Sequence, residues 1–411
     1  MLGISRCSVG ALSFQQGFPN GQKNAILLRR QAQYLYFQAG YSKTRVATLL
    51  GVSKGFVVSW TQSRQQDPAQ DARGWPKGQG RKWTATTRQR VCRLHAELER
   101  SPRAFYSGAT AIQQRYRICY PDSELPPLRT IGRILTEEGL SRSPKRRVRG
   151  ASRYLCYPEH TVYETLGARV LEADFIGQKY LAGRRAPLHF LGFSFKKAPK
   201  LRYFERVEAQ TAEVLMAACE RFFKTFEFPD VMKVDNGQAS IGSGSAKRCL
   251  SRFMLFLLKR RILPVFAVPK KPFSQASIEG NNSVFARKFW NSQRFRSLRD
   301  VDIRLAWFND ASLAYTGYDP TTRKRRASKR DFVPRVYFIR QVHQDPDTGK
   351  GMIDVLNEPV PLGKTYINYF VLAEWNLLEQ QLHVWFENDQ QPMLIKSMSF
   401  KNNPNSKYRL N

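Results

Sequence analysis

Three carboxylates in the middle of the chain have surroundings that suit metal-assisted chemistry on phosphate esters. Asp174 lies inside the apolar run Leu171–Ile176, and Asp235 directly follows the apolar run Val231–Val234. Glu279 lies at the start of an expected helix. A single carboxylate in an apolar strand is usually a satisfied polar residue or an edge position, because its burial is costly unless it is paired or bound to a cation. Three that converge can hold two divalent cations about 3.5–4 Å apart, which is the arrangement of two-metal phosphoryl transfer.

The donor set also indicates which cations these would be. Carboxylate oxygens are hard ligands, and together with a bound phosphate they favour Mg²⁺ or Mn²⁺. The six Cys and five His are scattered, so we expect no thiolate or imidazole metal site. Neither a Gly-rich phosphate loop before a helix nor a Ser/His/Asp or Cys/His nucleophile set is evident. The sequence therefore supports no protein side chain as the nucleophile.

Other acidic residues near the three carboxylates are expected to lie outside the site. Glu172 and Asp230 are predicted to alternate away from it along their strands. Glu213 and Glu220 lie on an expected helix and are interpreted as solvated.

Residues 160–310 must position the three carboxylates, and their pattern is that of an α/β domain with a mixed sheet. Three strand-like runs come first, followed by alternating helices and strands. We expect strands at 171–176, 188–193, 201–204, 231–234 and 263–266, and helices at 212–226, 247–259 and 277–291.

At these residues the chain resembles the DDE transposase and retroviral integrase superfamily. The matching pieces are Glu172-Ala-Asp-Phe175, Val234-Asp-Asn-Gly237 and Pro272-Phe-Ser-Gln-Ala-Ser-Ile-Glu279. The resemblance implies a ribonuclease-H-like core in which the catalytic Asp, Asp and Glu fall on Asp174, Asp235 and Glu279. It covers most of the chain and is densest in motifs from 171 to 290.

The chain departs from the family's pattern at three places. The interval from Asp235 to Glu279 is longer than usual, which implies a loop insertion around 237–247. Ala276 stands where Gly is usual, and Gly280-Asn-Asn follows Glu279 where Arg-Phe-Asn is common. The retroviral zinc module is absent, and helical units stand in its place.

Residues 22–66 are predicted to form a helix-turn-helix module that binds DNA. Ser42 and Ser53 can cap two short helices, and Gly51 permits the turn between them. The second helix would offer Lys54, Ser59, Gln62 and Arg64 to a major groove. An ordinary three-helix bundle without a ligand is the alternative interpretation.

A second helical DNA-binding module is expected over 84–141. Pro127 can open its last helix, whose Arg129, Thr130 and Arg133 share one side. The Pro- and Gly-rich segment 67–83 before it contains Arg81, which can lie in a minor groove or simply belong to a solvated linker.

Basic residues elsewhere are expected to contact DNA phosphates. The runs 141–153 and 321–330 each hold six basic residues and separate expected domains, although a solvated linker is the default interpretation of a charge run. The further residues expected at DNA are Lys145, Arg146, Arg147, Arg149, Lys270, Lys271, Asn282, Arg287, Arg325 and Arg326.

Residues 331–400 return to short strands separated by turns. Strands are expected at 336–339, 352–355, 365–370, 381–386 and 393–395, a spacing that suggests a small β-barrel domain.

The charge of the chain points to a polyanionic partner. The 411 residues carry a formal net charge of +34, and residues 1–153 hold 27 Lys and Arg against 8 Asp and Glu. Double-stranded DNA is the expected partner, bound mainly through the N-terminal third. No apolar stretch is long enough for a membrane helix, and the opening residues lack the order of a secretory signal, so we expect a cytoplasmic, nucleoid-associated protein.

These observations predict a transposase that binds its element's ends, cleaves at the 3′ ends and joins them to target DNA. Two ends must be joined together, so a homodimer or higher oligomer on DNA is expected, and an accessory ATPase is left open. A non-catalytic, domesticated DNA-binding regulator is one alternative. A metal-dependent nuclease without strand joining is another, because it would use the same three carboxylates.

Overall fold

The computed structural model describes residues 21–68, 83–141, 158, 161–162, 166, 169–242, 244, 246–269, 275–321, 332–388 and 391–409. The chain divides into two compact units, Met1–Thr84 and Ala85–Asn411. Each unit is described by itself.

The first unit contains three helices, α1 (Gly21–Phe37), α2 (Lys43–Leu50) and α3 (Lys54–Trp60). The Ser42 and Ser53 side chains accept hydrogen bonds from the backbone N–H groups of Arg45 and Phe56, which fixes where α2 and α3 begin. Gly51 ends α2 with φ +63°, a left-handed conformation that glycine adopts without strain. The unit's small core is formed by Ala32, Val46, Ala47 and Val57.

The second unit begins with α4 (Ala85–Arg100), α5 (Ala109–Cys119) and α6 (Leu128–Glu137). These helices share a core that includes Val91, Ile112 and Ile131. The residue before α5 is Gly108, without a side-chain cap, whereas the Ser107 hydroxyl turns back to Glu99. Ser107 therefore does not cap α5.

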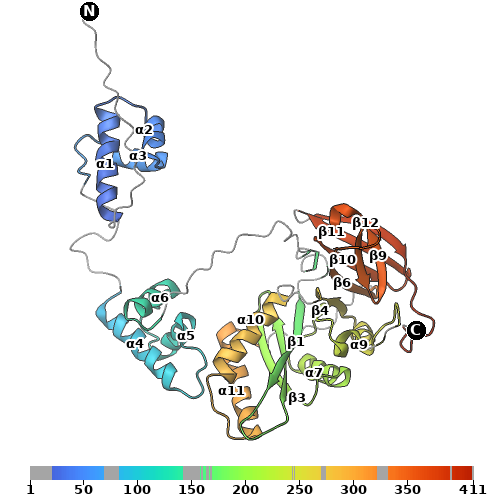
Figure 1. Ribbon diagram of the computed structural model, residues 1–411. Helices are drawn as coiled ribbons and strands as arrows, with labels where there is room; N and C mark the ends of the chain where they lie inside the picture. Colours follow the sequence, from blue (N-terminus) through green and yellow to red (C-terminus); the bar gives the residue numbers. More distant parts are fainter. Residues whose placement is uncertain are drawn as a thin grey trace, which may run out of the picture. The chain divides into compact units, whose positions relative to one another are not determined.

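A nine-stranded mixed sheet is the centre of the second unit (Figure 1). Its order is β12-β11-β10-β6-β5-β4-β1-β2-β3. Strands β1 and β2 and strands β2 and β3 pair antiparallel, whereas β4 is parallel to β1 and β5 is parallel to β4. The bounds of these five strands are β1 (Val170–Lys179), β2 (Leu188–Phe195), β3 (Leu201–Val207), β4 (Val231–Val234) and β5 (Leu263–Phe266).

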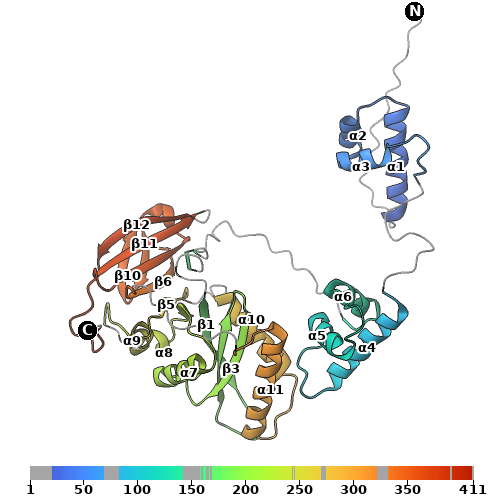
Figure 2. The same cartoon turned by 180° about the vertical axis from the view of Figure 1, so that it is seen from behind.

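Helices cover both faces of these five strands (Figures 1 and 2). One face packs against α7 (Ala212–Thr225) and α9 (Arg252–Lys259), through a core that includes Ala173, Phe222 and Phe253. The other face packs against the segments α10 (Ala276–Phe285), η3 (Ala286–Trp290) and α11 (Leu298–Thr316). A four-residue helix, α8 (Gln238–Ile241), follows β4. This arrangement agrees with the expected α/β core with a mixed sheet.

The C-terminal strands continue the same sheet. Strand β6 (Arg335–Gln341) pairs parallel with β5 and antiparallel with β10 (Phe370–Asn376), and β11 (Gln381–Asn388) and β12 (Gln391–Ser399) follow. A separate sheet holds β7 (His343–Gln344), β8 (Gly351–Val355) and β9 (Glu358–Leu362). The 3-10 turn η4 (Lys364–Tyr366) follows β9 in the chain. The described strand pairings do not close into a barrel, so the expected barrel is not confirmed.

None of the helices in the described ranges combines the length and the apolar character that crossing a bilayer requires.

Candidate active site

Strand β1 presents Asp174 on the sheet face that α10 covers. Successive side chains of a strand point to opposite faces, so Glu172, Asp174 and Ile176 share one face while Leu171 and Ala173 share the other. Ile176 indeed belongs to the apolar cluster under α10 and α11, and Ala173 belongs to the cluster on the opposite face.

Glu172 therefore does not alternate away from the site. It lies two residues before Asp174 and is 1% exposed. Its carboxylate accepts a hydrogen bond from the backbone N–H of Ile278 at 2.9 Å, which ties β1 to the first turn of α10. The expectation that placed Glu172 outside the site is wrong, because a spacing of two residues keeps a strand residue on the same face.

Asp235 lies directly after β4, the parallel neighbour of β1. The Ser240 hydroxyl lies 3.4 Å from its Oδ1 and can donate to it. A Cβ atom on Gly237 would come within 2.8 Å of Asp235 Oδ2, so a side chain at this position would displace the Asp235 carboxylate.

Helix α10 brings Glu279 and Asn282 to the same face of the sheet. The Asn282 amide donates from Nδ2 to Asp174 Oδ2 at 2.9 Å. This contact depends on Gly192, which pairs with Asp174 across β1 and β2, because a Cβ there would lie 3.0 Å from Asn282 Oδ1. Asn282 therefore orients Asp174, and its expected contact with DNA stays a prediction.

The electrostatics of Asp174 show that the three carboxylates influence one another. Burial and then the charges of Asp235 and Glu279 raise the pKa of Asp174 from 3.8 to about 7, against a lowering effect of the Asn282 hydrogen bond. Repulsion of this kind is expected where carboxylates converge without a cation between them.

Glu279 also has a raised pKa, through burial and then the charge of Glu172.

A buried ion pair lies beneath the three carboxylates. Lys233 Nζ is 3.6 Å from Glu172 Oε1, and the two side chains are 2% and 1% exposed. Lys233 comes from β4, two residues before Asp235. Together with the Ile278 contact, this pair links the three elements that carry Asp174, Asp235 and Glu279.

The residues fit divalent cations in donor chemistry. All three side chains supply hard carboxylate oxygens, and cations would relieve the repulsion that raises the pKa of Asp174. Within the described ranges, no three His, Cys, Asp or Glu side chains are close enough to hold a metal ion as they stand.

Asn236 and Arg340 are further residues of this region that the sequence reasoning missed. The Arg340 guanidinium, from β6, donates from Nη2 to Asn236 Oδ1 at 3.0 Å. Asn236 could have been found from the sequence, because it follows Asp235 in the Asp-Asn-Gly motif. No sequence signal pointed to Arg340, which is 104 residues away.

A second chain of contacts joins α10 to the segment before α5. Arg202 on β3 donates to Asn281 of α10 at 2.7 Å and to the Tyr106 hydroxyl at 3.0 Å. The Tyr106 ring stacks on Tyr315 of α11 with ring centroids 4.3 Å apart. The helical module 84–141 is thus attached to the core through Tyr106 and its neighbour Phe105, which is buried in the α10–α11 cluster.

The residues expected at DNA in the first unit are exposed. Lys54 and Ser59 lie on α3, whereas Gln62 and Arg64 follow it, because α3 ends at Trp60. Gln62 and Arg64 were expected on the second helix of the module, and they lie instead on the segment after it. Arg64 lies near Phe37 of α1, with its guanidinium 5.8 Å from the ring centroid.

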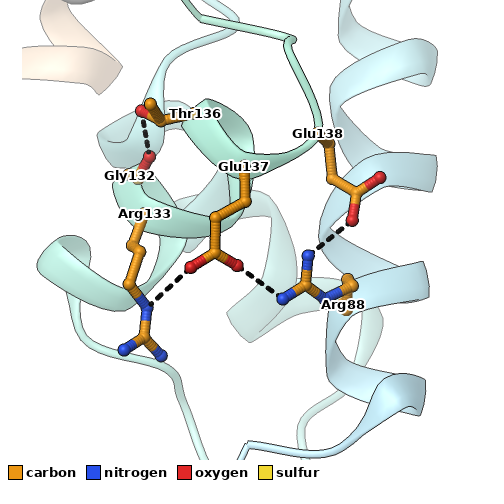
Figure 3. Close-up of polar contacts among 6 residues, drawn as sticks. All are labelled: Arg88, Gly132, Arg133, Thr136, Glu137 and Glu138. Carbon is orange, nitrogen blue, oxygen red and sulfur yellow. Dashed lines mark hydrogen bonds and ion pairs between the residues drawn. The ribbon is translucent and has the colours of Figure 1, made fainter.

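In the second unit, the basic side of α6 is tied to acidic residues at its C-terminal end (Figure 3). Glu137 lies 3.7 Å from Arg133 Nε and 2.5 Å from Arg88 Nη2, and Glu138 lies 2.6 Å from Arg88 Nη1. These pairs raise the pKa of Arg88, chiefly through the hydrogen bonds to Glu138 and Glu137. Arg129 is exposed and Thr130 is half-buried.

Most other residues expected at DNA lie outside the described residues. Arg287 is exposed after α10 and donates to the Ser283 carbonyl. The residues of which the structure describes nothing are Arg81, Lys145, Arg146, Arg147, Arg149, Lys270, Lys271, Arg325 and Arg326.

A cavity of about 470 Å³ lies beside the expected loop insertion. Gln238, Gly242 and Ser251 line it together with Asn357 from the turn after β8 and Tyr408 near the C-terminus. None of the three carboxylates lines this cavity, so it is separate from the site.

Comparisons with known proteins give partial matches. Residues 28–74 match the family model described as "Putative ATPase subunit of terminase (gpP-like)", which covers only a small part of the chain. No curated protein matches.

Solved structures similar to this chain include integrases and a transposase. The catalytic core of bovine immunodeficiency virus (BIV) integrase is 12% identical, covers 36% of this chain and 83% of its own, and has a TM-score of 0.26. A simian T-cell lymphotropic virus intasome in complex with a PP2A regulatory subunit is 12% identical, with 72% and 96% covered and a TM-score of 0.31. The Mos1 strand transfer complex is 13% identical, with 75% and 96% covered and a TM-score of 0.26. At these values the matches do not establish a family for this chain.

Proposed function

We propose that this protein is a DNA transposase of the integrase-like DDE type. One observation carries the proposal: β1, the end of its parallel neighbour β4 and the first turn of α10 carry Asp174, Asp235 and Glu279, and the charges of the last two act on the buried Asp174 carboxyl and raise its pKa. Carboxylates carried by two adjacent strands and a helix are the donor set that two-metal phosphoryl transfer uses.

The chain's own residues would hold this donor set in place. Asn282 orients the Asp174 carboxylate, Ser240 contacts that of Asp235, and Glu172 fixes the first turn of α10 next to Glu279. Divalent cations, when bound, would activate the attacking oxygen and stabilise the leaving oxygen. Cleavage by water and joining by a DNA 3′-hydroxyl are both in-line displacements at phosphorus, so one site can serve both.

DNA binding is supported by charge and by exposed basic helices. The net charge of +34 favours association with a polyanion. Lys54 on α3 and Arg129 on α6 are exposed, each in a small helical module. We propose that the modules 22–66 and 84–141 bind the ends of the element and that two or more copies of the chain join both ends to target DNA.

The test uses Asp174→Asn, Asp235→Asn and Glu279→Gln in the full chain, with DNA that carries the sequences flanking the reading frame. Each variant should lose 3′-end cleavage and joining with Mg²⁺, since a neutral amide is a poor ligand for a hard dication. Binding to the same DNA should survive. Glu213→Gln is the matched control, because Glu213 is exposed and pairs with Arg252 on the opposite sheet face.

The outcomes separate the alternatives. Cleavage and joining by the wild type support a transposase, and cleavage without joining indicates a nuclease. DNA binding without either reaction indicates a regulator. Near-normal joining by any one of the three variants would show that its carboxylate is wrongly assigned.

A further inference from the structure

Arg340 is a buried cation at the end of β6, with 6% of its surface exposed. Its Nε donates to the Asp354 carbonyl at 2.9 Å, and its Nη1 lies 2.9 Å from the Ile339 carbonyl and 3.3 Å from the Ala267 carbonyl. Its Nη2 donates to Asn236 Oδ1 at 3.0 Å. A buried guanidinium is tolerated when its donors are satisfied in this way.

Asn236 is held at both ends of its side-chain amide. Its Oδ1 accepts from Arg340, and its Nδ2 donates to the Ala267 carbonyl at 2.5 Å. Ala267 is itself fixed, because its N–H donates to the Val234 carbonyl at the end of β4. The residue between Val234 and Asn236 is Asp235, so the backbone on both sides of this carboxylate is anchored.

The anchor comes from the C-terminal strands. Strand β6 pairs parallel with β5 only at Val265 with Tyr337 and at Phe266 with Phe338. Parallel strands end at the same edge of a sheet, so Arg340, two residues after Phe338, reaches the edge where β4 delivers Asp235. The strands expected as a separate domain thus contribute a side chain beside the candidate site.

We infer that Arg340 is a positioning residue for Asp235, acting through the side chain of Asn236. The inference rests on the proposed role of Asp235 as a metal ligand. It adds that the C-terminal strands complete the metal site, so that the segment 160–310 alone does not contain everything the site needs.

A purely structural role for Arg340 makes a different prediction. If Arg340 only satisfied backbone carbonyls, its loss would lower stability without a specific change in metal affinity. If it orients Asp235 through Asn236, removing either side chain should weaken metal binding by a similar factor, and removing both should add little. Residues that act along one path show this kind of non-additivity.

The experiment measures Mn²⁺ binding to the full-length protein without DNA, by the electron paramagnetic resonance signal of free Mn²⁺. The variants are Arg340→Met, Asn236→Ala and their double variant, with Asp235→Asn defining full loss of the site. Arg335→Met is the matched control. Arg335 also lies on β6 and is ion-paired, with its Nε 3.1 Å from Glu374 Oε1.

Arg340→Met and Asn236→Ala should each weaken Mn²⁺ binding about 10- to 100-fold, as is typical when an outer partner of a metal ligand is lost. The double variant should bind Mn²⁺ at most about twofold more weakly than the weaker-binding single variant. Arg335→Met should bind Mn²⁺ as the wild type does. The Mn²⁺ concentration for half-maximal DNA cleavage should shift by the same factors. Binding to end DNA in EDTA should not change.

Arg340→Met can also lower the midpoint of thermal unfolding, since it leaves buried carbonyls without a donor. Asn236→Ala keeps the bonds of Arg340 to those carbonyls, so its Mn²⁺ affinity tests the positioning role even if Arg340→Met is less stable. Wild-type Mn²⁺ affinity in Asn236→Ala, or additive losses in the double variant, would overturn the inference while leaving the proposed function intact. A wild type that neither binds Mn²⁺ nor cleaves DNA would overturn both.

Discussion

The Asp174 carboxyl is destabilising in the metal-free protein at neutral pH. Its pKa is 3.8 in an unperturbed chain and about 7 in the folded protein. Between these values the folded protein holds a proton that the unfolded chain has released. The contribution of this group to the free energy of unfolding is therefore lost as pH rises from about 4 through about 7.

Asp174→Asn should remove this loss. Relative to the wild type in EDTA, the variant should gain on the order of 4 kcal/mol in the free energy of unfolding between about pH 4 and pH 8. Urea unfolding at both pH values measures it. A wild type that keeps its stability relative to the variant as pH rises would contradict the electrostatic picture, even if the variant is catalytically inactive.

The Glu172–Lys233 pair gives a second prediction for single residues. Glu172→Gln should destabilise the protein by about 3–5 kcal/mol, because it removes the carboxylate 3.6 Å from the buried Lys233 charge. Glu172→Gln with Lys233→Met should recover most of that loss, because a neutral pair avoids the desolvation cost. Urea unfolding of the two variants compares them, and equal losses would show that charge pairing does not matter here.

At the scale of elements, acidic residues at the C-terminal end of α6 pair with basic residues in the module that we propose binds DNA. Glu137 pairs with both Arg88 and Arg133 at the surface. Exposed pairs contribute little to stability, so Glu137→Gln should leave the urea midpoint nearly unchanged. If α6 contacts DNA, the variant should bind it more tightly, and the log–log salt slope should steepen by at most about one unit.

Glu97→Gln is the control for this experiment. Glu97 on α4 pairs with Arg115 on α5, so this variant frees an arginine that does not belong to α6. Arg133→Ala should act in the opposite direction to Glu137→Gln. Titrations at several salt concentrations measure all three variants. An unchanged affinity in both α6 variants would mean that this helix does not face DNA.

The sequence predicted elements well where local signals agree. Strands β4 and β5 were expected at their observed bounds, because each is a short, mostly apolar run rich in Val and β4 is followed directly by Asp235-Asn-Gly. Helix α11 was missed although Ser297 and Gly317 are ordinary signals of a helix start and end. Strand β9 was missed because Pro359 and Pro361 argue against a strand, and the structure places it at the edge of a sheet, where proline is tolerated.

One strand was expected in the wrong place. The run 365–370 alternates like a strand, but Asn368 has φ +73° and the 3-10 turn η4 occupies its start, so β10 begins only at Phe370. Local alternation cannot reveal a left-handed residue. For the candidate site, Asp174, Asp235 and Glu279 could be proposed from the sequence because their motifs are local. Arg340 could not, because its partner depends on how β6 pairs with β5.

At the scale of the whole molecule, the boundaries expected from sequence do not coincide with packing in the second unit. Phe105, from the module expected at 84–141, is 5% exposed and packs against Phe289 and Phe308 of the core. Strand β6, from the expected C-terminal domain, covers the edge of β5. A core cut at 160 and 310 would therefore expose an apolar patch and an open strand edge.

This predicts how the second unit responds to loss of its docked segment. Phe105→Ala in the full chain should lower the free energy of unfolding of the second unit by about 3–5 kcal/mol, as expected for removing a buried aromatic ring. Tyr41→Ala, in the first unit, is a control that should leave the second unit's transition unchanged. A fragment of residues 154–320 should bind a hydrophobic dye and aggregate, whereas residues 85–411 should unfold cooperatively in urea. Two results together would contradict this prediction: an unchanged unfolding transition of the second unit in Phe105→Ala, and the same urea midpoint for the short and the long fragment. The module 84–141 and the C-terminal strands would then not stabilise the core.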